Sequence, residues 1–115
     1  MAATEITVTN LKFNTAEALP ATAALDGTDG AVIDFSSAED RRILIIIENS
    51  DSENAEEVTV KKGTGIQATG DHVVSVAAST TVCAVVESGK FKNMSNGLVN
   101  ITGSSDVKVA AVALP

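Results

Sequence analysis

The side chains that could support catalysis are few in this chain, and they are scattered. His72 is the sole histidine, Cys83 is the sole cysteine, and neither tryptophan nor tyrosine occurs. A catalytic triad at His72 would need an acid and a nucleophile beside the imidazole. Asp71 is its sequence neighbour, but adjacent residues of a strand point to opposite faces and pair poorly. We therefore expect no catalytic site and predict that the protein is not an enzyme.

Cys83 stands between Val82 and Ala84 in an apolar run. A reactive thiol needs a nearby cation to lower its pKa, and this run carries none. A free cysteine in such a place usually packs as a small buried hydrophobe, which is our prediction here. A lone cysteine also excludes an intrachain disulfide.

Two acidic pairs and one glycine-rich segment could bind ligands. Asp26 with Asp29, and separately Asp51 with Glu53, offer carboxylates to a hard cation such as calcium. Neither pair has the spacing of a complete calcium loop, so a solvated turn is the simpler interpretation and a metal remains an alternative. Residues 63–65 read Gly-Thr-Gly after a predicted strand, but no helix and no third glycine complete a phosphate-binding fingerprint. We expect no cofactor.

Charge and composition argue against several classes of partner. The formal charge is −7, with 15 acidic against 8 basic residues, whereas nucleic acids and anionic membranes are bound through Lys and Arg. Base stacking needs aromatic rings, and the chain has only three Phe. No apolar run approaches the roughly 18 residues of a membrane helix. The expected partners are therefore proteins, with no nucleic acid and no membrane.

The dominant pattern is the alternation of short apolar runs with turn residues. From residue 42 onward, runs of Val, Ile, Ala and Thr are separated by Gly, Asn, Ser and Asp, which is typical of strands that hide one face and then reverse. We predict strands over residues 6–13, 31–35, 43–47, 57–62, 72–76, 80–87, 91–94, 98–102 and 107–114. A chain of 115 residues is expected to form one domain. The predicted fold class is all-β: a single-domain antiparallel β-sandwich, jelly-roll-like, over residues 31–115.

The first 30 residues differ from the rest. Apart from a short first strand they lack a sustained apolar period, and residues 14–30 contain Ala-rich stretches, Pro20 and a turn cluster. A connection this long in a small domain is usually functional or packed against a neighbour. We predict that residues 1–30 form an extended N-terminal arm or long connection that docks onto a partner. Its candidate interface residues are Ile6, Val8, Leu11 and Phe13.

Two further segments are candidates for contacts. Five consecutive large apolar residues, 43–47, cannot all face one way along a strand, so a second layer or another subunit must cover each face. We predict a homotrimer whose contacts include this run or residues 107–114, with Ile45 and Ile46 as candidates. Lys90, Phe91 and Lys92 form a basic cluster in which Phe91 could anchor a contact. An inward Phe91 between two outward lysines is the simpler alternative.

Three stretches, residues 58–68, 86–93 and 107–115, resemble small proteins that decorate or cement the capsids of tailed bacteriophages and prophages. The resemblance covers roughly residues 42–115. It implies a structural virion protein that binds the major capsid protein on the capsid exterior, often as a trimer, and stabilises or decorates the shell. With no basic and apolar leader at the start of the sequence, synthesis in the host cytoplasm is expected. The alternative is another phage tail or surface-displayed β-sandwich that serves as an adhesion or binding module.

Overall fold

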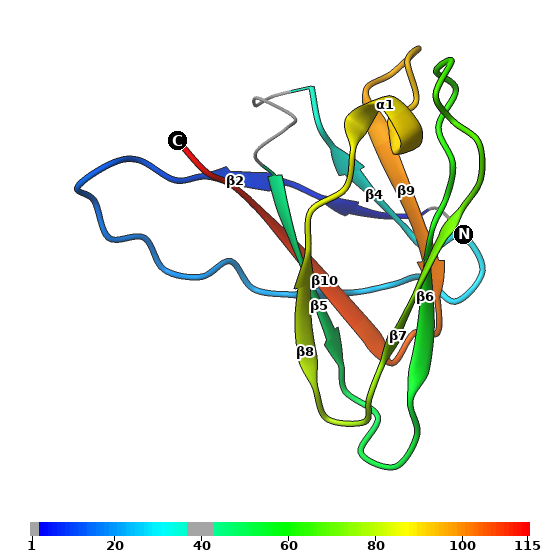
Figure 1. Cartoon of the computed structure of the whole chain (residues 1–115). Helices are drawn as coiled ribbons and strands as arrows, with labels where there is room; N and C mark the ends of the chain where they lie inside the picture. Colours follow the sequence, from blue (N-terminus) through cyan, green and yellow to red (C-terminus); the bar gives the residue numbers. More distant parts are fainter. Residues whose placement is uncertain (1–2, 37–42) are drawn as a thin grey trace.

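Two β-sheets pack face to face in the computed structural model, which describes residues 3–36 and 43–115 (Figure 1). Sheet A contains, in spatial order, β1 (Thr4–Ile6), β4 (Ala31–Asp34), β9 (Leu98–Gly103), β6 (Glu56–Val60) and β7 (His72–Val76). Sheet B contains β2 (Val8–Asn10), β10 (Val107–Ala113), β5 (Ile43–Asn49) and β8 (Thr81–Ala84), and β3 (Ala23–Ala24) also pairs with β10. One helical turn, α1 (Ser88–Phe91), is the only helix among the described residues. The predicted all-β sandwich is confirmed.

The antiparallel pairs of the sandwich are nested. β3 pairs with β10, β4 with β9, β5 with β8, and β6 with β7. The first strand of this series thus pairs with the last, the second with the last but one, and so on inward. Such nesting is what a long hairpin produces when it wraps into the double Greek key of a jelly roll. These eight strands therefore have the predicted jelly-roll layout.

The first two strands depart from the predicted antiparallel arrangement. β1 runs parallel to β4, and β2 runs parallel to β10, so the chain crosses from sheet A to sheet B at Thr7. Ile6 and Val8 both point between the sheets and are only 7% and 5% exposed. The sequence predicts that these two residues belong to a surface arm, but in the structure they pack in the core. This corrects the prediction for Ile6 and Val8, which are core residues and not surface contacts.

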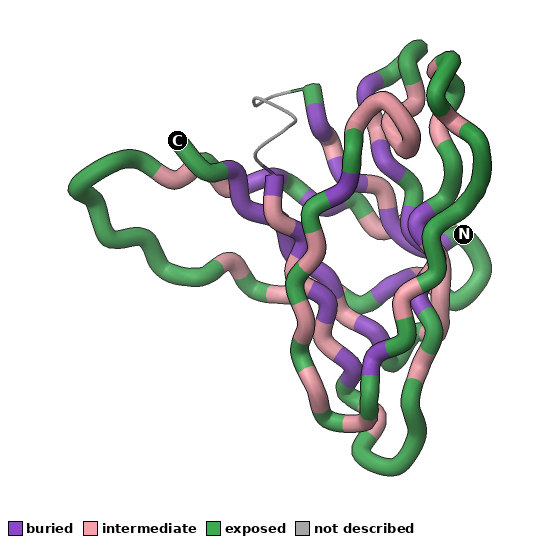
Figure 2. Tube along the Cα trace, viewed as in Figure 1, coloured by how far each residue is buried: buried purple, intermediate pink, exposed green. Residues whose placement is uncertain are grey.

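The part of the predicted arm that leaves the sandwich is residues 11–22, which we call the projecting loop (Figure 1). Its start is fixed because the Leu11 N–H donates to the Ala113 carbonyl oxygen (2.8 Å). Its end is fixed because β3 pairs with β10. Between these anchors residues 12–19 are all exposed, as the uninterrupted green of this stretch in Figure 2 shows.

The core is built from alternate residues of the strands. In β5, Ile43, Ile45 and Ile47 are fully buried, whereas Leu44 and Ile46 point outward and are half-buried. The apolar run therefore does serve both faces of the strand, as a period of two requires. Ile45, a candidate interface residue, lies in the core because the register places odd-numbered residues of β5 inward.

Residues 91–94, predicted as a strand, begin instead within the helical turn. The N–H groups of Lys90 and Phe91 donate to the Glu87 carbonyl oxygen, and the Lys92 N–H donates to that of Ser88 (2.9 Å). Lys92 then forms an isolated bridge to Val99. A run of four residues is too short to distinguish a strand from a turn, so local hydrogen bonds decided the conformation. No helix in the described part of the chain is long and apolar enough to cross a membrane.

Candidate interaction surfaces

The outer face of sheet B is apolar across three adjacent strands. The register places Ala110 of β10, Ile46 of β5 and Cys83 of β8 in one row. Ala110 is buried, so the exposed part of this face lies toward β8. We call this part the outer patch: Leu44 and Ile46, which are half-buried, and Cys83 and Val85, which are exposed. An apolar sheet face that no second layer covers is typical of a protein contact surface.

Cys83 belongs to this patch, which corrects its predicted burial. It lies directly opposite Ile46, which faces outward, and side chains of paired residues point to the same face. Its inward-facing neighbour Val82 packs against the core instead. The apolar run around Cys83 forms a strand as predicted, and its pairing with β5 determines which of its residues face outward.

A row of polar side chains closes one end of the outer face. Lys108 of β10 lies opposite Glu48 of β5. The Thr22 hydroxyl donates to Glu48 Oε1 (3.0 Å). Because β10 lies between β3 and β5, this bond crosses β10 and ties the returning end of the projecting loop to sheet B.

The projecting loop exposes two large apolar side chains. Phe13 is 75% exposed and Leu19 is 81% exposed. Asn14, next to Phe13, has a positive φ of 58° and turns the chain. No hydrogen bond joins the backbone of residues 16–21 to the described part of the chain. Of the candidate interface residues in the arm, Phe13 is thus fully available to a partner, and Leu11 is half-buried at the anchor.

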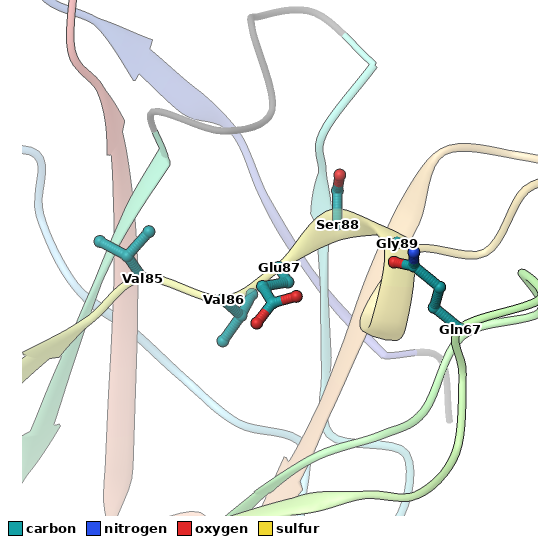
Figure 3. A pocket seen from close by; sticks show the side chains of 6 residues that line it. All are labelled: Gln67, Val85, Val86, Glu87, Ser88 and Gly89. Atoms are coloured by element: carbon teal, nitrogen blue, oxygen red, sulfur yellow. The ribbon is translucent and has the colours of Figure 1, made fainter.

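Two hollows lie side by side between the end of β8, α1 and the loop after β6, and together we call them the edge groove. The first, of about 330 Å³, is lined by Gln67, Val85, Val86, Glu87, Ser88 and Gly89 (Figure 3). The second, of about 520 Å³, is lined by Thr64, Gly65, Ile66, Gln67, Gly89 and Met94. The Gln67 amide lies against Gly89, where the two hollows meet (Figure 3). With Val85, Ile66 and Met94 exposed along it, the groove fits apolar side chains.

The basic cluster at α1 is only half-exposed. Phe91 packs against the core, and its ring centroid lies 6.2 Å from that of His72 at a tilt of 52°. The Lys90 ammonium lies 3.7 Å from the Glu87 carboxylate. Phe91 is therefore the inward aromatic of the simpler alternative, and the candidate contact through Lys90, Phe91 and Lys92 has no exposed aromatic anchor.

The residues that were considered for catalysis, His72, Cys83 and Asp71, do not form a common site. His72 and Cys83 are exposed on edge strands of different sheets. The Asp71 carboxylate accepts hydrogen bonds from the Lys62 N–H (2.7 Å) and the Lys61 ammonium (3.2 Å), which together hold the pKa of Asp71 below its usual value. Asp71, which lies just before β7, is thus engaged with the two lysines.

One acidic cluster combines a predicted residue with two that the sequence did not single out. Carboxylate oxygens of Asp51, Glu56 and Asp106 all lie within 4.8 Å of one another. The N–H groups of Glu53 (2.9 Å) and Asn54 (3.1 Å) donate to Asp51 and lower its pKa. The pKa of Glu56 is raised, first by partial desolvation and then by its contact with Asp51 and the charge of Asp106. Glu53, the predicted partner of Asp51, contributes only its backbone.

The other acidic pair forms a turn. Asp26 accepts a hydrogen bond from the Asp29 N–H (2.8 Å), and its backbone exchanges hydrogen bonds with Gly30. Gly30 has a φ of +72°, and a Cβ there would overlap the Ile101 carbonyl, so only glycine can close the turn. These bonds match the simpler interpretation of a solvated turn.

Three surface features thus remain for interaction: the outer patch, the projecting loop and the edge groove. All three expose large apolar side chains, and none combines the groups of a catalytic constellation within the described residues. No protein-family model, curated protein or solved structure matches this chain.

Proposed function

We propose that this protein is a structural virion protein that assembles as a homotrimer on the outside of a phage capsid and stabilises or decorates the shell. The observation that carries the proposal is the outer patch, an apolar face on a small sandwich whose own two layers are already complete. Such a face favours a protein partner. In the proposed assembly the partners are other copies of this protein and the major capsid protein.

Association through this face gains from each apolar side chain that it covers. Fully burying an exposed large apolar side chain contributes about 1.5–3 kcal/mol. Val85 is 59% exposed, whereas Leu44 and Ile46 are already half-buried and gain less, so several such contacts must together offset the roughly 4–15 kcal/mol cost of association. The net charge of −7 keeps separate copies soluble before assembly.

The capsid is the partner that the resemblance implies, and its repeated surface suits a weak binder. A trimer that touches three equivalent shell sites gains affinity from multivalency, so each contact can remain modest. The major capsid protein is therefore the proposed partner, with no cofactor required.

The test is co-sedimentation with particles that lack this protein. We expect the purified protein to pellet with the shells at a fixed, saturable ratio to the major capsid protein. Ile46→Lys should reduce the bound amount, whereas Ser75→Lys, at an exposed position of sheet A, should bind as the unmodified protein does. Protein that stays in the supernatant at every concentration contradicts the capsid role, and binding to tails or to host cells instead supports the adhesion alternative.

A further inference from the structure

The projecting loop and the outer patch lie at opposite edges of sheet B. The loop joins β2 and β3, which both pair with β10 on the side away from β5. The exposed residues of the patch belong to β8 and the segment that follows it, at the other edge of the sheet. Because the loop extends away from the sandwich, it does not cover the patch of its own chain (Figure 1).

Both features are uncharged overall on a chain that is strongly acidic. Residues 11–22 carry one positive and one negative charge, Lys12 and Glu17, and residues 81–86 carry none. Two copies with a charge of −7 each repel one another over most of their surfaces. Uncharged surfaces are where such copies can approach at the least electrostatic cost.

Both features also have backbone groups that lack partners. Residues 16–21 make no backbone hydrogen bond with the described part of the chain. β8 pairs only with β5 among the described strands, so its outer edge is open. An open strand edge is a template for a segment of another chain, and the adjoining edge groove offers hollows for apolar side chains.

We infer that the projecting loop of one copy packs onto the β8 edge of a second copy, with Phe13 and Leu19 covering the outer patch and entering the edge groove. This assigns the loop to a neighbouring subunit and not to the shell. The contact is head-to-tail, and such contacts either close into rings or continue as filaments. A ring of three copies rests on the proposed function; the pairing of loop with edge does not.

Cys83 provides a native probe for this contact. It is the only cysteine of the chain and is exposed in the outer patch. We would introduce Ala18→Cys beside Leu19, treat the purified protein with a short bismaleimide, and separate the products on a denaturing gel. We expect covalent dimers and trimers and no larger species.

Matched variants identify which surfaces are joined. Ala18→Cys combined with Cys83→Ser should lose the crosslinked products, as should unmodified protein with Cys83 alone. Thr28→Cys, exposed in the turn between β3 and β4, controls for random collisions and should give few products. Products that persist in the Cys83→Ser background mean that loops contact loops, which overturns the inference. If the Ala18→Cys protein that keeps Cys83 gives no crosslinked products at several hundred micromolar, the inference is also overturned.

A second measurement removes the side chains themselves. Phe13→Ser with Leu19→Ser should raise the dissociation constant of self-association roughly tenfold or more, because two exposed apolar groups no longer become buried. Val73→Ser, which removes an exposed apolar side chain from sheet A, should leave it unchanged. An equal effect of both changes contradicts the inference.

The outcomes separate this inference from the capsid role. If sedimentation shows trimers but no crosslink forms between residue 18 and Cys83, the loop contact is overturned. The capsid role is then decided by the co-sedimentation test alone. Crosslinked trimers that fail to pellet with particles keep the loop contact and remove the capsid role.

Discussion

The side-chain amide of Asn49 donates a hydrogen bond to the carbonyl oxygen of Val76, 3.1 Å away, and so joins the end of β5 in sheet B to the end of β7 in sheet A. The same amide donates to the Asn54 carbonyl oxygen (3.0 Å), and its oxygen accepts from the Asp51 N–H (2.9 Å). Asn49 is 1% exposed and is the one buried polar residue in the described part of the chain. It closes one end of the sandwich by satisfying backbone groups of Asp51 and Asn54 in the loop after β5 and of Val76 at the end of β7.

Replacing Asn49 with Ala should lower the free energy of unfolding strongly. The buried Val76 carbonyl left without this partner costs about 1–3 kcal/mol, and the lost part-buried hydrogen bonds to Asn54 and Asp51 add to that cost. Urea denaturation followed by circular dichroism measures the loss. Asn100→Ala, at an exposed position of β9, is the control and should shift the midpoint little. Similar midpoints for the two variants would show that Asn49 does not close the sandwich.

Neighbouring residues of β5 should respond in opposite ways to substitution. Ile45→Ala leaves a cavity in the core and should cost about 2–5 kcal/mol of stability without a specific effect on assembly. Ile46→Lys changes an outward residue and should leave the chain folded while it weakens self-association. Denaturation and analytical ultracentrifugation on both variants separate the two effects. An unfolded Ile46→Lys protein would be evidence that this face is packed within the subunit.

The N-terminal strands and the projecting loop should differ sharply in their effect on folding. Deleting residues 1–10 removes Ile6 and Val8 from the core, at about 1.5–3 kcal/mol each, which is a large part of the roughly 5–15 kcal/mol that stabilises a typical domain. We expect a protein that is largely unfolded or melts far earlier.

Replacing residues 12–19 with three Gly or Ser residues is the matched control, and it should leave the thermal midpoint nearly unchanged. Six residues then join Leu11 to Ala23, whose partners Ala113 and Val109 lie four residues apart on β10, about 13 Å. A large loss of stability in this variant would mean that the loop contributes to the core.

Glu56→Gln should stabilise the protein at neutral pH but not at acidic pH. The folded state raises the pKa of Glu56 above its ordinary 4.5, first through partial desolvation and then through Asp51 and Asp106, so the ionised carboxylate opposes folding at pH 7. The uncharged amide removes this cost, and its advantage should fade as the pH falls toward and below 4.5, where the carboxyl group is protonated in both states. Urea midpoints at pH 7 and pH 3 test this, with Glu53→Gln as control. A gain of equal size at both pH values would rule out the electrostatic cause.

The alternation of apolar and polar residues was enough to predict where most strands lie. A period of two shows which residues share a face, so the run at residues 43–47 had to serve two faces, and the turn residues between runs indicated the reversals of a sandwich. Charge and the absence of tryptophan and tyrosine similarly limited the kinds of partner. These are local properties that each segment carries by itself.

Which face is covered, and by what, was decided only by the pairing of distant segments. Ile6 and Val8 enter the core because the chain changes sheets at Thr7, and Cys83 is exposed because its register with Ile46 places it outside. Asp106 joins Asp51 because β10 and β5 lie side by side, although the two carboxylates are far apart in sequence. A period of two shows which residues share a face, but only the tertiary neighbours determine which face is covered.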